Sequence, residues 1–425
     1  MAQPMDGNSV VVPAINSASS VCCLRSLGKR GITTIAVSEK GSPPAYWSRY
    51  VDETVHVPSF TDDVVAYKDG LLSLARRDDV QAIVTLREID VYVLSKYRDE
   101  FAEHITPTWP SMETLQTAQD RVRLVEAAAD AGVRVPKTRL LSEVENWDQK
   151  QIVKGRYAIL ASEYVDSYSE QEYGFAGTTM YLESGSEPDR ERVQAEMGHD
   201  PIVQEYVPGE EYAVWALYDH GDQVATCLKG QVRAYQYEGG TSVCRETVEM
   251  PELREAGQIL LDQLDWHGPA AVQFMRDDES GEFVLLEINP RFWVSLSCAV
   301  RAGLDFPYYL WRMATGEPIL IDEEYEVGVM THLLRGELVH LHSVLRGTNP
   351  YINPPAFRTR AWEVAKSCYD QPNFDYLTLD DPGPFVRDIL NLADGVTDLF
   401  DATSDSESNV SGEVEREESA DQPSR

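Results

Sequence analysis

The first hundred residues alternate short apolar runs with stretches of helical periodicity. The β-branched run Val10–Ile15 precedes a polar turn and a helical pattern that ends at glycines 28 and 31. Ile32–Val37 and Gln81–Thr85 read as further buried strands, and a helical pattern follows over Tyr92–Phe101. Strands that alternate with helices in this way predict a parallel sheet with helices on its faces.

The first turn of this pattern argues against a dinucleotide site. Such a site carries G-x-G-x-x-G between its first strand and helix, whereas this chain has Asn16-Ser17-Ala18-Ser19-Ser20. Asn and Ser side chains would crowd a pyrophosphate. Plain packing of a parallel sheet is therefore the favoured interpretation, and an oxidoreductase is not expected.

Beyond residue 110 the pattern changes. Ser111 is a credible N-cap for a helix that ends near Ala118, and a second helix follows over Asp120–Ala131. Strands joined by hairpins, with separate helices, then continue to about Thr315. We expect an α/β N-terminal parallel-sheet domain (8–110) followed by an α+β domain (111–315). A helical extension (316–400) packs on the preceding domain, and the Ser-, Glu- and Asp-rich tail (401–425) is disordered.

The chain is strongly acidic, with a formal net charge of −34 and about three Arg for each Lys. This balance is typical of halophilic proteins from a high-salt, haloarchaeal cytoplasm, where counterions screen self-repulsion, and an ordinary acidic protein is the alternative. It disfavours nucleic acid and anionic membranes as partners. No apolar stretch approaches the roughly 18–20 residues of a membrane span, and the first residues lack a secretory signal. We expect a cytoplasmic protein.

The cysteines show no metal-binding or disulfide pattern. None belongs to a C-x-x-C pair or to a Cys/His run with zinc-ligand spacing. We expect small buried hydrophobes in a reducing compartment, with no disulfide and no structural metal. The six are Cys22, Cys23, Cys227, Cys244, Cys298 and Cys368.

The most informative segment lies between residues 271 and 291. It reads as two strands joined by a polar, Gly-containing hairpin. Residues two apart share a face of a strand. Glu287 and Asn289 therefore point the same way, and the same spacing assigns Phe283 and Leu285 to their face.

If the hairpin loop has about five residues, Gln273 lies opposite Glu287. One carboxylate and two amide oxygens at a strand end are costly to bury without a partner. Mg²⁺ prefers such oxygen ligands and keeps positions for phosphate. Arg291 would share the face and meet a phosphoryl group or an oxyanion. The alternative is a polar sheet edge with Glu287 and Arg291 merely ion-paired.

The string Glu287-Ile288-Asn289-Pro290-Arg291, after Val272-Gln273-Phe274, resembles the Mg-binding signature of the ATP-grasp superfamily, and especially its carboxylate–amine ligases. Many members have Glu at the position of Gln273, although carbamoyl-phosphate synthetases place Gln there. The resemblance covers about residues 8–315. It implies ATP between two lobes with a hinge near 204–209, and Mg²⁺ (or Mn²⁺) on Gln273, Glu287 and Asn289.

The other elements of such a site follow in the expected order. Lys154 ends a short strand and resembles the lysine that holds the α- and β-phosphates. The segment before the Pro-Gly turn resembles the hinge, which implies backbone contacts from Glu205 and Val207 to adenine and a side-chain contact from Gln204. Glu211 would then bind the ribose hydroxyls. A solvated lysine and a plain β-turn are the alternatives.

Arg233, followed by Gly239-Gly240, resembles an arginine and a loop near the γ-phosphate in these ligases, which implies a phosphate or carboxylate clamp. A surface hairpin is the alternative. The sequence departs from the pattern of these ligases at two places. The usual Asp-Lys pair is Asp120-Arg121, so Arg121 replaces that phosphate contact or the contact is missing. The usual Gly/Ser-rich phosphate-covering loop corresponds to Tyr164–Gly177, which is acidic and aromatic.

The resemblance implies a Mg-dependent ligase with Arg291 and Arg233 in catalytic roles. A substrate carboxylate attacks the γ-phosphate of ATP to form an acylphosphate, and an amine then displaces phosphate. A kinase or carboxylase on the same scaffold, or a non-catalytic nucleotide-binding protein, remains open. The expected partners are small-molecule carboxylates and amines. The Leu86-Arg87-Glu88 turn is a candidate part of the substrate pocket, and a homodimer is compatible with the sequence.

Overall fold

The computed structural model describes residues 8–39, 41–175, 177, 179–237, 239–321, 324–347 and 353–391. The expected disordered tail over residues 401–425 lies outside these residues.

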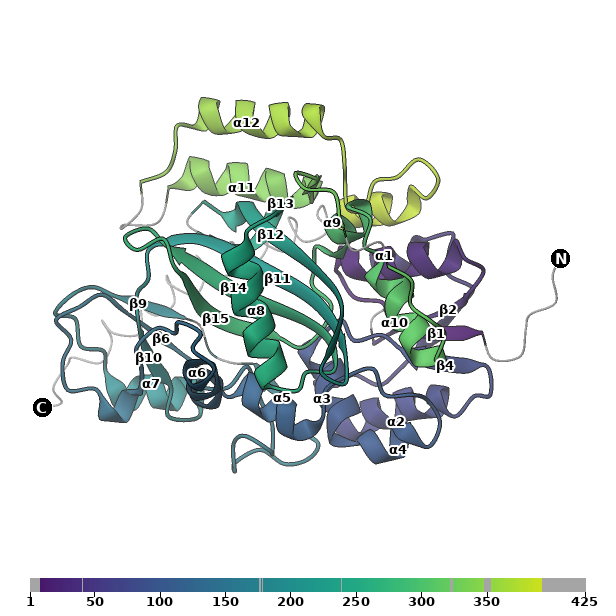
Figure 1. Ribbon diagram of the computed structural model, residues 1–425, viewed down its shortest axis with the longest axis horizontal. Coiled ribbons are helices and arrows are strands. Elements are labelled where there is room, and N and C mark those ends of the chain that lie inside the picture. Colours follow the sequence, from purple (N-terminus) through teal and green to yellow (C-terminus); the bar gives the residue numbers. More distant parts are fainter. Residues whose placement is uncertain are drawn as a thin grey trace, which may run out of the picture.

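The N-terminal residues form a four-stranded parallel sheet in the order β3-β2-β1-β4 (Figure 1). This confirms the α/β parallel-sheet prediction. The elements of this part are β1 (Ser9–Pro13), α1 (Ala18–Gly28), β2 (Thr33–Ser38), a 3-10 turn η1 (Pro44–Trp47), β3 (Glu53–His56), α2 (Val64–Ala75), β4 (Val80–Ile83), α3 (Glu88–Lys96) and α4 (Arg98–Ala102).

Both faces of the parallel sheet are buried. In β1, Val10 and Val12 face a core that includes α1 and two later helices, α9 (Leu296–Arg301) and α10 (Phe306–Thr315), whereas Val11 faces α2 and α3. Burial on both sides explains why β1 is apolar throughout rather than alternating. Because this core extends as far as Tyr376, the boundary at residue 110 stays a prediction.

Two helices and a small antiparallel sheet come next. Helices α5 and α6 begin after the N-caps Ser111 and Asp120, whose side chains accept backbone N–H bonds. The small sheet has the order β5-β10-β6-β9, and β7 pairs with β8. The elements are α5 (Met112–Gln119), α6 (Arg121–Asp130), β5 (Thr138–Leu140), η2 (Leu141–Glu143), β6 (Gln151–Lys154), β7 (Ile159–Leu160), β8 (Gly174–Phe175), β9 (Met180–Leu182), α7 (Arg190–Met197) and β10 (Ile202–Glu205).

The largest sheet is antiparallel, with six strands in the order β15-β14-β11-β12-β13-β16. Val214 and Ala216 of β11 point toward helix α8, and the alternate residues Ala213 and Trp215 point to the other face. Its elements are β11 (Gly209–Asp219), β12 (Asp222–Gln236), β13 (Gly239–Val248), α8 (Pro251–Gln263), β14 (Gly268–Asp277), β15 (Phe283–Asn289) and β16 (Met330–His332).

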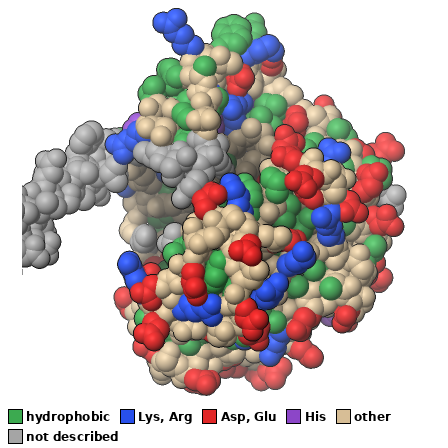
Figure 2. All heavy atoms as spheres, turned by 90° about the vertical axis from the view of Figure 1, so that its left-hand side faces the viewer, with side chains coloured by type: hydrophobic (Ala, Val, Ile, Leu, Met, Phe, Trp, Pro, Cys, Tyr) green, Lys and Arg blue, Asp and Glu red, His purple; other side chains and the backbone are tan. Residues whose placement is uncertain are grey.

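Helices α11 (Leu334–Arg346) and α12 (Phe357–Asp370) stack over the β12–β13 side of the large sheet (Figure 1). The chain then returns to the first sheet, where the buried guanidinium of Arg25 donates to Asp381 at 2.8 Å. On the face shown in Figure 2, acidic and basic side chains are interspersed. No helix among the described residues is long and apolar enough to span a membrane.

Candidate functional site

The β14–β15 hairpin sets the register of the candidate metal ligands. The two strands pair antiparallel with Gln273 opposite Glu287 and Ala271 opposite Asn289. Five residues, 278–282, separate the strands. The predicted register of Gln273 and Glu287 is confirmed.

The prediction that Phe283 and Leu285 share a face of β15 with Glu287 and Asn289 is wrong. Leu286 is an extra residue in the pairing, so the alternation of side chains shifts by one. Phe283 and Leu285 therefore join the apolar cluster under α8, whereas Glu287 and Asn289 line a cavity on the opposite face of the sheet. A bulge of this kind depends on the partner strand, and residue spacing alone does not reveal it.

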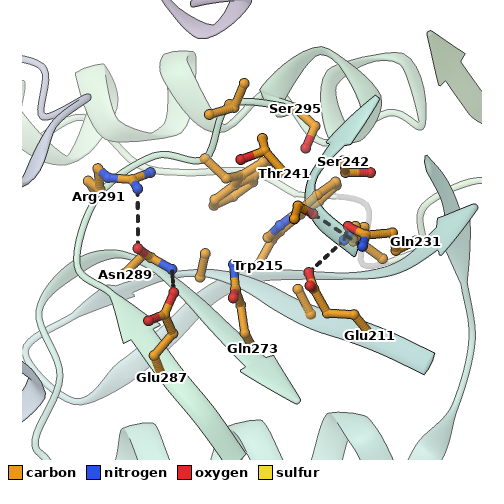
Figure 3. A pocket seen from close by; sticks show the side chains of 16 residues that line it. Glu211, Trp215, Gln231, Thr241, Ser242, Gln273, Glu287, Asn289, Arg291 and Ser295 are labelled. Carbon is orange, nitrogen blue, oxygen red and sulfur yellow. Dashed lines mark hydrogen bonds and ion pairs between the residues drawn. The ribbon is translucent and has the colours of Figure 1, made fainter. Parts of the chain in front are cut away.

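A cavity of about 330 Å³ lies on the face of the large sheet that α8 leaves uncovered. Figure 3 shows Glu287 and Asn289 on one side of this cavity and Glu211 and Gln231 on the other. Five of the predicted site residues line it: Glu211, Gln273, Glu287, Asn289 and Arg291. The rest of the lining includes Trp215, Lys229, Gly240, Thr241, Ser242, Trp293 and Ser295.

The Glu287 carboxylate interacts with two cations, Arg121 and Lys154. Arg121 Nη2 donates to its Oε2 at 3.1 Å, and Asn289 Nδ2 donates to Oε1 at 3.3 Å. Burial acts to raise the pKa of Glu287, but Arg121 and Lys154 outweigh burial and hold it below its ordinary value. Burial lowers the pKa of Lys154 to about 8, with Arg121 adding to the shift and Glu287 opposing it. The carboxylate is therefore charged, and it faces a surplus of positive charge.

Arg291 connects the cavity to the first sheet. Its Nε donates to Glu88 Oε1 at 2.9 Å, and its Nη2 donates to Asn289 Oδ1 at 3.2 Å. Burial raises the pKa of Glu88, and Arg291 opposes that shift. Gln119 Nε2 donates to the other Glu88 oxygen, and Tyr164 donates to Gln119 Oε1 at 2.6 Å. The turn after β4 and the start of the acidic loop thus meet at the cavity.

Sequence reasoning missed Lys229 of β12. It is 4% exposed, lines the cavity, and donates from Nζ to Glu211 Oε1 and Gln231 Oε1, both at 3.1 Å. Burial lowers its pKa, and Glu211 opposes the shift. The available signal was a single Lys directly after the mostly apolar run 224–228. Glu211, assigned to ribose by resemblance, is ion-paired here.

The predicted hinge residues lie apart from the main cavity. Gln204 is buried, donates from Nε2 to Thr138 Oγ1 at 2.8 Å, and lines a small neighbouring cavity together with Glu205. The backbone N–H of Glu205 donates to Lys137. Among the described residues, no backbone carbonyl accepts from the N–H of Val207. That N–H is thus available to a ligand.

Arg233 is not placed as the resemblance implied. It does not line the main cavity, and its Nε and Nη2 donate to the two oxygens of Glu337 at 2.8 and 2.7 Å. Nη2 also donates to Ser367 Oγ on α12. Burial opposes ionisation of Glu337, yet His332 and Arg233 lower its pKa to about 2. This ion pair holds the C-terminal helices on the large sheet. Arg233 also lines a second cavity, of about 230 Å³, together with Glu211 and Gln231, and its role as a phosphate or carboxylate clamp stays a prediction.

Arg233→Ala is therefore expected to destabilise the fold by about 3–5 kcal/mol, because it leaves a buried carboxylate without its cation. Denaturant unfolding of both proteins measures this loss. Arg276→Ala, at an exposed residue of β14, is the matched control and should stay within about 0.5 kcal/mol of the parent. A buried pair is little screened, so the loss should persist in high salt. An Arg233→Ala protein of normal stability that lacks only ATP turnover would restore the phosphate role.

A family model described as ATP-grasp in the biosynthetic pathway with Ter operon matches residues 198–333. That range contains β10 to β16 and all three candidate metal ligands. Comparison with curated protein sequences gave no match.

Solved structures match over more of the chain. An ADP complex of an N5-carboxyaminoimidazole ribonucleotide synthetase is 15% identical with a TM-score of 0.57, covering 87% of this chain and 98% of that chain. The Staphylococcus aureus N5-carboxyaminoimidazole synthetase with ADP is 14% identical, with a TM-score of 0.56 and coverage of 77% and 82%. The biotin carboxylase domain of Hydrogenobacter thermophilus 2-oxoglutarate carboxylase is 16% identical, with a TM-score of 0.56 and coverage of 77% and 74%.

Identities this low establish the fold alone. This chain has the ATP-grasp fold, a parallel-sheet part followed by antiparallel sheets and helices. The family match adds independent support for placing it in the ATP-grasp superfamily.

Proposed function

We propose that this protein is an ATP-dependent, Mg-requiring ligase that joins a small-molecule carboxylate to an amine. One observation carries the proposal: Gln273, Glu287, Asn289 and Arg291 line a single cavity on the face of the large sheet that α8 leaves uncovered. The structures with a similar fold include a Bacillus licheniformis protein described as an L-amino acid ligase, at 14% identity and a TM-score of 0.50.

The donor set of the cavity fits a magnesium ion. It offers the charged Glu287 carboxylate and the amide oxygens of Asn289 and Gln273. Within the described residues, no side chain hydrogen-bonds that of Gln273, so its oxygen is free to coordinate. When bound, the ion would neutralise phosphate charge. It would also supply Glu287 with a partner inside the cavity.

The reaction needs positioning and charge neutralisation rather than a protein nucleophile. A carboxylate oxygen of the substrate attacks the γ-phosphorus, the bond to the bridging oxygen breaks, and ADP leaves. The amine then attacks the acylphosphate carbon, phosphate leaves and the nitrogen loses a proton. Arg291 would stabilise the oxyanion formed in this second step, an effect of about 3–4 kcal/mol for one well-placed donor.

The triphosphate and base are assigned to residues around the cavity. Lys154 and Arg121 would hold phosphate oxygens, because they are the cations nearest Glu287. The Val207 N–H and the Glu205 backbone would contact adenine, with Gln204 beside them. Glu211 would bind ribose after release from Lys229, which would then be free to approach a phosphate. Two lobes joined near residues 204–209 would enclose the nucleotide.

A carboxylase is the second candidate, because the three matched structures described above all carry carboxylase or a carboxyaminoimidazole synthetase in their descriptions. Bicarbonate would take the place of the organic carboxylate, and the acylphosphate step would be the same. A kinase would stop after phosphoryl transfer.

A phosphate-release screen tests the proposal and separates these outcomes. The protein, kept in high salt to match its charge, is given Mg-ATP with amino acids and other carboxylates, each crossed with amines, and with bicarbonate. Product mass that grows by condensation supports a ligase. Growth by one phosphoryl group, or by CO₂, would replace the ligase with a kinase or a carboxylase. ATP binding without turnover in every combination would contradict an enzyme.

The pKa of Lys154 predicts a basic limb in the pH profile. Because its pKa is lowered to about 8, the side chain is protonated below this pH and loses its charge above it. We expect kcat/KM for ATP to fall as pH rises through about 8. In Lys154→Arg that limb should move beyond the measured range, since Arg stays protonated. A limb that is identical in both proteins would show that another group titrates.

A further inference from the structure

Helix α12 forms the outermost layer above the large sheet and is mostly open to solvent. It packs on α11 (Figure 1), and of its 14 residues, all within the described part of the chain, Val364 alone is buried. A helix of this length is marginal in water by itself, and helices in proteins are stabilised chiefly by the packing of an apolar face. We therefore expect α12 to have a further partner.

The outward face of α12 carries a regular stripe of side chains. Trp362 is 67% exposed and Tyr369, about two turns further on, is 86% exposed. Ala365 and Arg358 are exposed as well. The four positions follow one another at spacings of four, three and four residues, which is the spacing of a coiled-coil seam. Val364, which faces the protein, lies on the other side of the helix.

We infer that this seam joins two copies of the chain, with α12 packed antiparallel on the α12 of the second copy about a two-fold axis. In that arrangement Trp362 lies opposite the partner's Ala365, and a small residue opposite a large one lets the helices approach closely. Tyr369 lies opposite the partner's Arg358, where a guanidinium over the ring is a favourable cation–π contact. The seam is thus complementary to itself, as a two-fold interface requires.

Charge favours the same face for contact between copies. Each chain carries a net charge of −34, so two copies repel each other over most of their surfaces. In contrast, α11 and α12 together hold five basic and three acidic residues, a net charge of +2. Hydrophobic and basic side chains predominate at the top of the molecule in Figure 2, where α12 lies. A different acidic protein would match the basic residues but not the alternation of large and small side chains.

The exposed apolar area indicates how strong the contact is. A fully exposed aromatic side chain offers roughly 150–250 Å², so Trp362 and Tyr369 together offer about 250–400 Å² in each copy. One partner of a standard interface contributes about 800 Å². The seam therefore predicts a reversible dimer with a dissociation constant in the micromolar range, rather than a permanent one. This inference does not depend on the proposed ligase activity.

Sedimentation velocity of the full chain in high salt, from low to high micromolar concentration, tests the dimer. We expect a reversible monomer–dimer equilibrium, and at least a tenfold rise in its dissociation constant in Trp362→Ala. Trp47→Ala, at a tryptophan of η1 that is 47% exposed, is the matched control and should leave the dissociation constant unchanged. A chain that stays monomeric throughout would overturn the dimer and leave this face to a different protein.

A second variant, Ala365→Phe, separates a specific seam from general adhesion of apolar surface. The change adds apolar area, so non-specific association would become tighter. In the proposed pairing the new ring collides with the partner's Trp362, and the dissociation constant should rise at least tenfold. Both substituted positions are exposed, so both variants should fold, as circular dichroism will show. A tighter dimer in Ala365→Phe, or an unchanged one in Trp362→Ala, would exclude the seam.

Discussion

Glu287→Gln is expected to reduce ATP turnover on the order of a thousandfold while leaving the fold intact. Glutamine has nearly the same shape, so the β14–β15 pairing and the bulge at Leu286 are kept. What disappears is the negative charge between Arg121 and Lys154, and with it the only carboxylate in the proposed magnesium donor set.

Two measurements check this result. Phosphate release with the best substrate pair reports turnover. The rise in melting temperature that ATP produces with magnesium, compared with ATP alone, reports metal-dependent binding without any need for the second substrate. Glu255→Gln, at an exposed residue of α8 on the opposite face of the sheet, is the control and should match the parent. Near-normal phosphate release by Glu287→Gln would contradict the proposed metal site.

Arg291→Ala is expected to lower kcat by about 10²–10³-fold with ATP binding retained. The side chain lies at the cavity end that faces Glu88 and the first sheet, so its loss should affect the reacting carboxylate more than the nucleotide. Arg291→Lys should recover only part of the rate, because a single ammonium cannot reach Glu88 and Asn289 together in the way a guanidinium does.

The split between kcat and nucleotide binding separates this role from a structural one. Removing Arg291 also leaves Glu88 without its cation, so folding stability must be measured beside activity. Glu88→Gln is the companion variant: it removes the same ion pair but keeps Arg291. If Glu88→Gln is as inactive as Arg291→Ala, the ion pair rather than the arginine itself matters. A fully active Arg291→Ala protein would exclude the oxyanion role.

Much of the secondary structure was readable because it depends on local patterns. The first apolar strand, the cap at Ser111 and the polar five-residue hairpin each express short-range chemistry; the strand spans Ser9–Pro13 where the run Val10–Ile15 was expected, and the cap and hairpin occur where predicted. The pairing of Gln273 with Glu287 followed from the length of that hairpin. The orientation of Phe283 did not, because a bulge depends on how the neighbouring strand packs.

Candidate residues far apart in sequence were harder to judge. Arg233 resembled a phosphate clamp, but its partner is Glu337, about a hundred residues later, and no local pattern links the two. Lys229 was overlooked because one lysine in a strand usually lies at the surface. Cys244 and His332 pair across β13 and β16, although 88 residues separate them, and no spacing in the sequence reveals that contact.

The sequence by itself determined the fold class and the register of the hairpin that carries the candidate metal ligands, because strand alternation, caps and short motifs act over a few residues. The tertiary structure alone decided which charged groups are neutralised by one another and which face the cavity. Ion pairing inside a protein depends on distance and burial rather than on position along the chain. For this reason Arg233 and Arg291, which were both predicted to bind phosphate or an oxyanion, have different partners in the structure: Arg233 pairs with Glu337, and Arg291 pairs with Glu88.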